Sequence, residues 1–130
     1  MQIVNEYPPI YEQAAEVFPL SGNEIFAWGD TIYYPKGGEI PVWLIGHEKV
    51  HSRQQGGNPE VWWSQYLVDT QFRYEQELEA HQVEYRVFCK NNKDRNKQVK
   101  YLHAISRRLA SPMYGSVVNF GEAMRRIKHG

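Results

Sequence analysis

The chain has 130 residues and a formal net charge of zero, from 15 Lys and Arg side chains against 15 Asp and Glu. Its 42% hydrophobic and 23% charged residues are typical of a globular protein and exclude a disordered or fibrous one. The zero conceals a split: residues 1–89 carry 5 basic and 13 acidic side chains (net −8), and residues 90–130 carry 10 basic and 2 acidic ones (net +8). A neutral total therefore does not exclude an anionic partner for the basic C-terminal segment.

The cysteine content, the N-terminal segment and the length of the apolar stretches predict a soluble cytoplasmic protein. Cys89 is the one cysteine, so an internal disulfide is excluded, which fits a reducing compartment. The N-terminus lacks the charged and apolar regions of a signal peptide. No stretch approaches the roughly 18 apolar residues of a membrane span. We therefore expect a single domain over residues 1–130 with no membrane partner.

In the first part of the chain, turn residues separate short patterned segments. Pro8-Pro9 and Pro19 bound a short helix, and alternating residues on both sides of Gly29-Asp30 predict a β-hairpin. Pro41 suits the first position of a helix that ends before the breaker run 56–59. The predicted elements are a helix over about 11–17, strands over 24–28 and 31–35, and a helix from 41 to about 55.

The remainder of the chain is predicted to be helical. A short helix over 59–68 precedes a long helix over 70–90, which Asp69 caps, and a polar connector over 91–97 follows. Apolar stripes predict a helix over 98–110 and a last helix that starts at Ser111-Pro112. The stripe residues expected to face inward are Val99, Leu102, Ile105, Leu109, Val117, Phe120, Met124 and Ile127. We expect an α+β fold, mostly helical, with a small antiparallel sheet near the N-terminus and a C-terminal helical cap over 98–130.

Residues 47–51 read His-Glu-Lys-Val-His, an HExxH motif. Four residues of helix turn about 400°, so His47 and His51 lie on one face and can bind the same Zn²⁺. Glu48 projects to the neighbouring side, where it can act as general base on the water that zinc activates. The motif predicts zinc-dependent hydrolysis of a carbonyl compound.

A catalytic zinc needs a third protein ligand and an open position. The extended motif with a downstream glycine does not fit, because Gln54 stands at the glycine position and Gly57 comes too soon for the third ligand. The following helix offers Glu75, Glu77 and Glu79. Only one or two of them can face the HExxH helix, since neighbouring positions point about 100° apart.

The segment HEKVHSRQ, followed by Glu77 in ELEAH 26 residues after His51, resembles the gluzincin metallopeptidases. It is also similar to the very small gluzincin-like metallopeptidases encoded in tailed-phage genomes, and the likeness covers about residues 24–90. The resemblance implies a zincin-like fold and a peptide or protein substrate. It also implies Zn²⁺ bound by His47, His51 and Glu77, and Glu48 as general base. If the protein is phage-encoded, we expect it in the host cytoplasm or associated with the virion.

The resemblance implies further roles. Segment 31–35 stands where relatives have an edge strand that pairs with extended substrate. His81 occupies the position of an aspartate that in many relatives orients a zinc-binding histidine, so it could bond to a ligand or replace Glu77 as the third ligand. A Tyr or His commonly stabilises the oxyanion, and Tyr114 is the candidate, with His103 and Tyr74 as alternatives.

Two other functions compete with the peptidase hypothesis. The chain could be an inactive zinc-binding interaction module, although an intact Glu48 argues against this. The basic C-terminal helices could bind nucleic acid or another polyanion, although a solvated surface that balances the acidic helix is the simpler interpretation. The basic side chains concerned are Arg107, Arg108, Arg125, Arg126 and Lys128.

Overall fold

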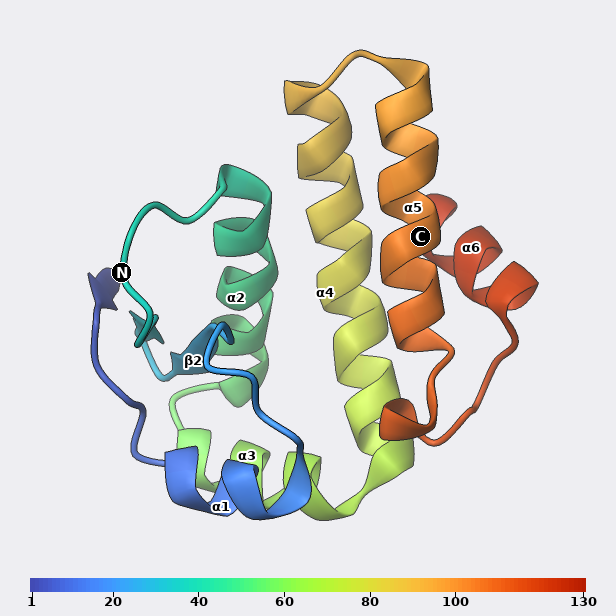
Figure 1. Cartoon of the computed structure of the whole chain (residues 1–130). Helices are drawn as coiled ribbons and strands as arrows, with labels where there is room; N and C mark the ends of the chain where they lie inside the picture. Colours follow the sequence, from blue (N-terminus) through green and yellow to red (C-terminus); the bar gives the residue numbers. More distant parts are fainter.

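The computed structural model describes residues 1–130 and shows a mostly helical α+β fold (Figure 1). Its elements are β1 (Gln2–Val4), α1 (Tyr11–Val17), β2 (Phe26–Trp28), β3 (Thr31–Tyr33), α2 (Val42–Gln55), α3 (Pro59–Val68), α4 (Thr70–Asn91), α5 (Arg95–Leu109), the 3₁₀ turn η1 (Pro112–Tyr114) and α6 (Phe120–Lys128). The predicted combination of many helices with a small N-terminal sheet is confirmed.

The sheet has three strands in the order β1-β3-β2. β2 and β3 form the predicted antiparallel hairpin, with Gly29 at a φ of 59° in its turn. The expectation of a purely antiparallel sheet is wrong, because β1 adds in parallel on the other side of β3. Segment 31–35 is therefore no edge strand: β3 lies at the centre, and its hydrogen bonds to both neighbours leave no edge for a substrate.

Helices α2 and α4 lie side by side and form the framework of the site (Figure 1). Gly46 of α2 faces α4, where an added Cβ would lie in ordinary contact distance of Val83 and Val87, at 3.7 and 3.5 Å. Gln55 at the end of α2 ties the helix to the sheet, since its amide donates to the Ala27 carbonyl over 2.8 Å. The HExxH helix is thus fixed between the sheet and α4.

Two clusters of buried apolar side chains support this framework. One packs α1, β2 and α3 together, and its buried members are Ile10, Ala14, Phe18, Phe26, Trp62, Trp63 and Tyr66. The other lies among α4, α5, η1 and α6, and its buried members are Tyr74, Leu102, Ile105, Leu109, Tyr114, Val118, Ala123 and Ile127. The metal-ligand candidates described below lie on α2 and α4, and α4 contacts both clusters, the first through Phe72 and the second through Tyr74.

The C-terminal elements differ from the predicted ones. α5 begins at Arg95 rather than 98, because Asp94 accepts hydrogen bonds from two backbone amides of its first turn. No long α-helix starts at Ser111-Pro112: only the 3₁₀ turn forms there, the chain then takes up positive φ at Gly115, and α6 begins at Phe120. The turn changes which side chains face inward.

Three predicted core positions are wrong: two lie after Ser111, and Val99 is exposed although it lies within α5. Val99, Val117 and Phe120 are 49%, 37% and 36% exposed, whereas Val118 is buried. The periodicity fails after Ser111 because the segment is not one continuous helix.

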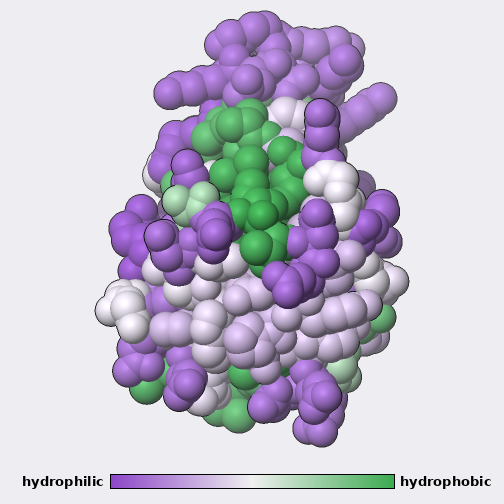
Figure 2. Space-filling view, turned by 90° about the vertical axis from the view of Figure 1, so that its left-hand side faces the viewer, coloured by the Kyte–Doolittle hydropathy of each residue, from purple (hydrophilic) through white to green (hydrophobic).

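Apolar surface remains on the side of the molecule that carries the sheet and α2. Figure 2 shows it as one green patch below a hydrophilic end. Exposed apolar residues of these elements include Ile3 of β1 and Val42 at the start of α2. No helix combines the length and the hydropathy needed to cross a membrane.

Candidate metal centre

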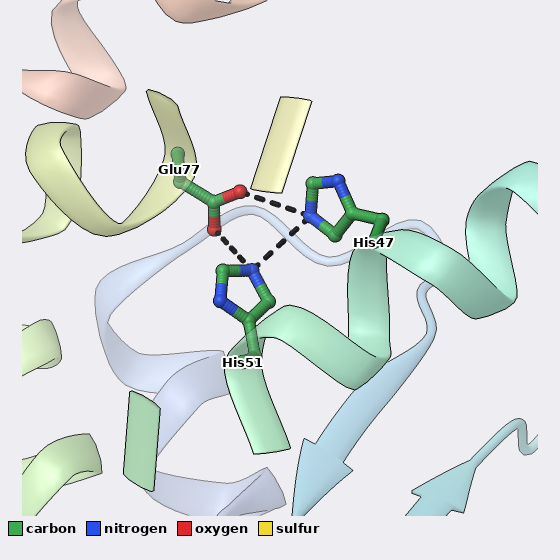
Figure 3. Close-up of side chains that lie close together, drawn as sticks. All are labelled: His47, His51 and Glu77. Carbon is green, nitrogen blue, oxygen red and sulfur yellow. Dashed lines mark hydrogen bonds and ion pairs between the residues drawn. The ribbon is translucent and has the colours of Figure 1, made fainter. Parts of the chain in front are cut away.

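His47 and His51 on α2 point toward Glu77 on α4, and all three side chains are buried (Figure 3). The two Nε2 atoms lie 3.1 Å apart. Oε1 of Glu77 lies 3.0 Å from Nε2 of His47, and Oε2 lies 3.2 Å from Nε2 of His51. The predicted ligand atoms thus converge on one point.

The other nitrogen of each histidine is bonded away from this point. Nδ1 of His47 lies 2.7 Å from Oε1 of Glu84, and Nδ1 of His51 lies 2.8 Å from Oε1 of Gln54. The Gln54 amide nitrogen donates to the Gln76 carbonyl over 3.0 Å, which orients its oxygen toward His51. Both acceptors require a proton on Nδ1, so the neutral form of each ring directs a bare Nε2 lone pair at the convergence point.

Of the three candidate glutamates on α4, only Glu77 is buried. Glu75 and Glu79 are exposed, and Glu79 forms an ion pair of 2.6 Å with Arg53. Glu77 also accepts a 2.5 Å hydrogen bond from the hydroxyl of Tyr66 on α3. The packing of α4 against α2 and α3 thus places Glu77, and not Glu75 or Glu79, beside the two histidines.

His81 is buried but does not belong to the group formed by His47, His51 and Glu77, whose ligand atoms lie within 4.8 Å of one another. Its Nδ1 lies 3.0 Å from Oε1 of Glu84, the carboxylate oxygen that also holds His47. His81 instead forms a second buried group with His47 and Glu84 that could also hold a metal ion. Its Nε2 is buried without a hydrogen-bond partner.

Glu84 is the site residue that the sequence reasoning missed. It lies one turn beyond His81 and two turns beyond Glu77 on the same face of α4, and its second oxygen accepts a hydrogen bond from Tyr101. The carboxylate that orients a candidate ligand therefore comes from position 84 and not from position 81. The i, i+4, i+7 spacing of residues 77, 81 and 84 was the available signal.

The buried charges stabilise one another. Burial lowers the pKa of His47, but Glu77 and Glu84 outweigh this effect and raise the pKa well above its ordinary value. Burial likewise opposes the charge of Glu77, yet His47 and His51 hold the pKa of this carboxyl well below its usual range. Without a metal, protons on the histidines therefore supply the positive charge at the convergence point.

Glu48 is buried beside this group, with Oε2 3.9 Å from Nε2 of His47. Burial is the main effect that raises the pKa of Glu48, to about 7, with further contributions from the charges of Glu77 and Glu84. Its carboxylate lines a cleft and accepts no hydrogen bond from a protein group. Such a carboxylate is available to exchange a proton with a molecule in the cleft.

The cleft has a volume of about 510 Å³. Its walls come from α1, the segment before β2, α2, α3, α4, the end of α5 and η1. Trp62 and Trp63 are buried core residues, as expected, and also line the cleft. About half of the lining residues are hydrophobic, so the cleft combines an apolar surface with the polar centre.

Tyr114 lies in the cleft wall, and the two alternative residues do not. Tyr114 on η1 is buried, and burial together with the charge of Glu77 raises the pKa of its hydroxyl. The hydroxyl of Tyr74 instead accepts a 2.9 Å hydrogen bond from Arg126 in the C-terminal core. His103 packs against the ring of Phe120, with ring centroids 5.5 Å apart.

The five basic side chains named above are all exposed. Arg126 is held by Tyr74 and lies 3.8 Å from Glu122, and Arg107 lies over the ring of Phe120. Arg108 alone of the five lines the cleft. Of these five basic residues, Arg108 is thus the one placed to contact a molecule in the cleft.

Comparisons with protein families, curated proteins and solved structures found no match.

Proposed function

We propose that the protein is a zinc-dependent metallopeptidase with a minimal zincin-like fold. The observation that carries the proposal is the convergence of two Nε2 atoms and one carboxylate, with the opposite histidine nitrogens bonded to Glu84 and Gln54. The two Nε2 atoms and the two Glu77 oxygens, at separations of 3.0–3.2 Å, form a group that a metal ion could occupy in place of the histidine protons. The order of sheet, HExxH helix and glutamate helix supports the zincin-like fold.

The donor set fits zinc. Two imidazole nitrogens and one carboxylate are a common ligand set of catalytic zinc, with bonds of about 2.0–2.2 Å. Tetrahedral ligands at such distances lie about 3.3 Å apart, by geometry from those bond lengths. The observed separations of 3.0–3.2 Å need only a few tenths of an ångström of expansion. Glu84 accepts a hydrogen bond from His47, and Tyr66 donates one to Glu77. Both bonds would keep these two ligands oriented toward the metal.

When bound, zinc would supply a Lewis acid that polarises a peptide carbonyl and lowers the pKa of water to about 7. Glu48 would take the proton of the attacking water and deliver it to the leaving amine. Tyr114 lies in the cleft wall and would donate a hydrogen bond to the developing oxyanion. The apolar walls would hold side chains of the substrate on both sides of the cleaved bond.

The decisive experiment combines zinc analysis with Glu48→Gln. We expect about one equivalent of zinc in both the native protein and the variant, and a loss of peptide hydrolysis in the variant by a factor of roughly 10²–10⁴. Lys49→Gln is the matched control, because Lys49 is the exposed neighbour on the same helix and should retain activity. Zinc binding without any turnover on a broad peptide library would instead favour the inactive interaction module.

A further inference from the structure

Arg108 is the one lysine or arginine among the residues that line the cleft. It lies at the end of α5, outside the part of the chain that resembles a metallopeptidase. The arginine ion pairs of the structure are formed by Arg53 and Arg126, and Arg108 takes part in none of them. An exposed guanidinium at the edge of a cleft, with its donors free, is available to a ligand.

The other charged residues of the cleft are acidic or belong to the metal centre. Glu24 lines the cleft from the segment before β2, and its carboxylate is already engaged by Ser21 and Gly22. Burial raises the pKa of Glu24, but these hydrogen bonds outweigh it and hold the pKa below its usual value. A substrate carboxylate would thus be repelled at Glu24, and outside the metal centre it would be attracted at Arg108.

Arg108 also lies within electrostatic reach of the two tyrosines next to the metal centre. Burial and a nearby carboxylate raise the pKa of both Tyr101 and Tyr114, and the positive charge of Arg108 acts in the opposite direction on each. Tyr101 donates a hydrogen bond to Glu84, and Tyr114 is close enough to Glu77 to feel its charge. Arg108 and Tyr114 line the same cleft as Glu77 and Glu84, so a ligand held at Arg108 lies in the cleft that contains the metal centre.

We propose that Arg108 binds a carboxylate of the peptide substrate, so that the cleft favours peptides with an acidic side chain or a free C-terminus on the α5 side. The inference rests on the proposed peptidase function and adds the substrate class. The planar fork of arginine matches a carboxylate with two parallel hydrogen bonds, a contact that lysine reproduces only in part. Arg108 is thus a specificity-determining residue, separate from the groups that bind metal or move protons.

The test uses peptides that share one apolar core and differ in a single charge. One pair carries Glu or Gln at each position flanking the core, and a second pair has a free or an amidated C-terminus. For the native zinc-loaded protein we expect KM to be about tenfold lower for the carboxylate peptide of at least one pair. The pair that shows the difference identifies the source of the carboxylate. The preference should shrink at high salt, since Arg108 is exposed.

Arg108→Gln should reduce this ratio of KM values to about one, and Arg108→Lys should retain part of it. Lys100→Gln is the control, because Lys100 is an exposed cation of the same helix that does not line the cleft. It should keep the full preference. Zinc content and circular dichroism of each variant verify that the metal centre and the fold are intact. An unchanged preference in Arg108→Gln, or no preference in the native protein, would overturn the inference.

A binding measurement separates this inference from the proposed function. Peptide affinities are measured by fluorescence anisotropy on zinc-loaded Glu48→Gln protein, with and without Arg108→Gln. If the native protein hydrolyses no peptide, the peptidase proposal fails, yet the ratio of the Kd values still decides whether Arg108 binds the carboxylate. If hydrolysis occurs with no difference between paired peptides, the inference about Arg108 fails alone.

Discussion

Glu84→Gln should weaken zinc binding while the protein remains folded. Glu84 is 1% exposed, and its Oε1 accepts hydrogen bonds from Nδ1 of His47 at 2.7 Å and Nδ1 of His81 at 3.0 Å. Gln keeps the volume and an oxygen that can still accept both bonds. Its amide nitrogen then faces Tyr101, whose hydroxyl must change from donor to acceptor. The substitution thus removes a charge and leaves the packing intact.

The magnitude follows from the lost charge. A hydrogen bond to a charged group contributes about 1.5–3 kcal/mol and a neutral one about 0.5–1.5 kcal/mol. For the two histidines together the difference amounts to roughly 2–3 kcal/mol, which corresponds to an increase of at most about 30- to 160-fold in the Kd for zinc. Most of this effect should pass through His47, because it is the histidine that also reaches the metal.

Competition with a chromophoric chelator measures the Kd, and circular dichroism measures folding. Glu75→Gln is the matched control, since Glu75 is an exposed glutamate of the same helix and should leave the Kd unchanged. Glu77→Gln removes a ligand and should lose more affinity than Glu84→Gln. A Kd for Glu84→Gln within twofold of the native value would refute the supporting role of this carboxylate.

Three further predictions follow from the site and its surroundings. Tyr66→Phe removes the 2.5 Å hydrogen bond to Glu77 and should raise the Kd for zinc about tenfold in the same chelator assay. Burial lowers the pKa of His47 and His51, but the nearby carboxylates outweigh it and raise both pKa values. In the metal-free protein the protonated histidines therefore stabilise the fold below about pH 6.5, and this stabilisation is lost as the pH rises through the raised pKa. Zinc must displace these protons, so zinc affinity should fall toward acid pH, and the gain in Tm on adding zinc should be larger at about pH 8 than at about pH 6; an equal gain would contradict this. Gly115→Ala should lower the Tm by several degrees in a thermal melt, because φ is +80° and the new Cβ would lie 2.9 Å from Thr70 Oγ1. Gly57→Ala, at a φ of +82° in open space, should cost less, and an equal loss would exclude the clash.

Local signals in the sequence were sufficient for the central helices. Asn58 accepts a hydrogen bond from the first turn of α3, and Asp69 accepts one from the first turn of α4. The predicted ranges 59–68 and 70–90 therefore agree closely with Pro59–Val68 and Thr70–Asn91. Caps and breakers act through neighbouring backbone groups, so they can be read without knowledge of the fold.

Elements that depend on distant partners could not be read in this way. β1 has three residues, and it is a strand only because β3 pairs with it in parallel. The segment after Ser111 has a helical periodicity, but it folds as a 3₁₀ turn and an extended connection before α6. Here, tertiary packing overrides the local pattern.

In the candidate site, too, some residues could be predicted from local spacing, whereas others depend on tertiary packing. The sequence alone placed His47, Glu48 and His51 on one helix, because the four-residue spacing brings two imidazoles to the same face whatever surrounds it. It could not choose among the glutamates of α4, since each has a similar propensity for helix and a similar charge. Only the packing of α4 against α2 and α3 turned Glu77 inward and brought Glu84 behind His47, at a sequence separation of 37 residues. Spacing along one helix is a local property, whereas the meeting of two helices is decided by the burial of their side chains.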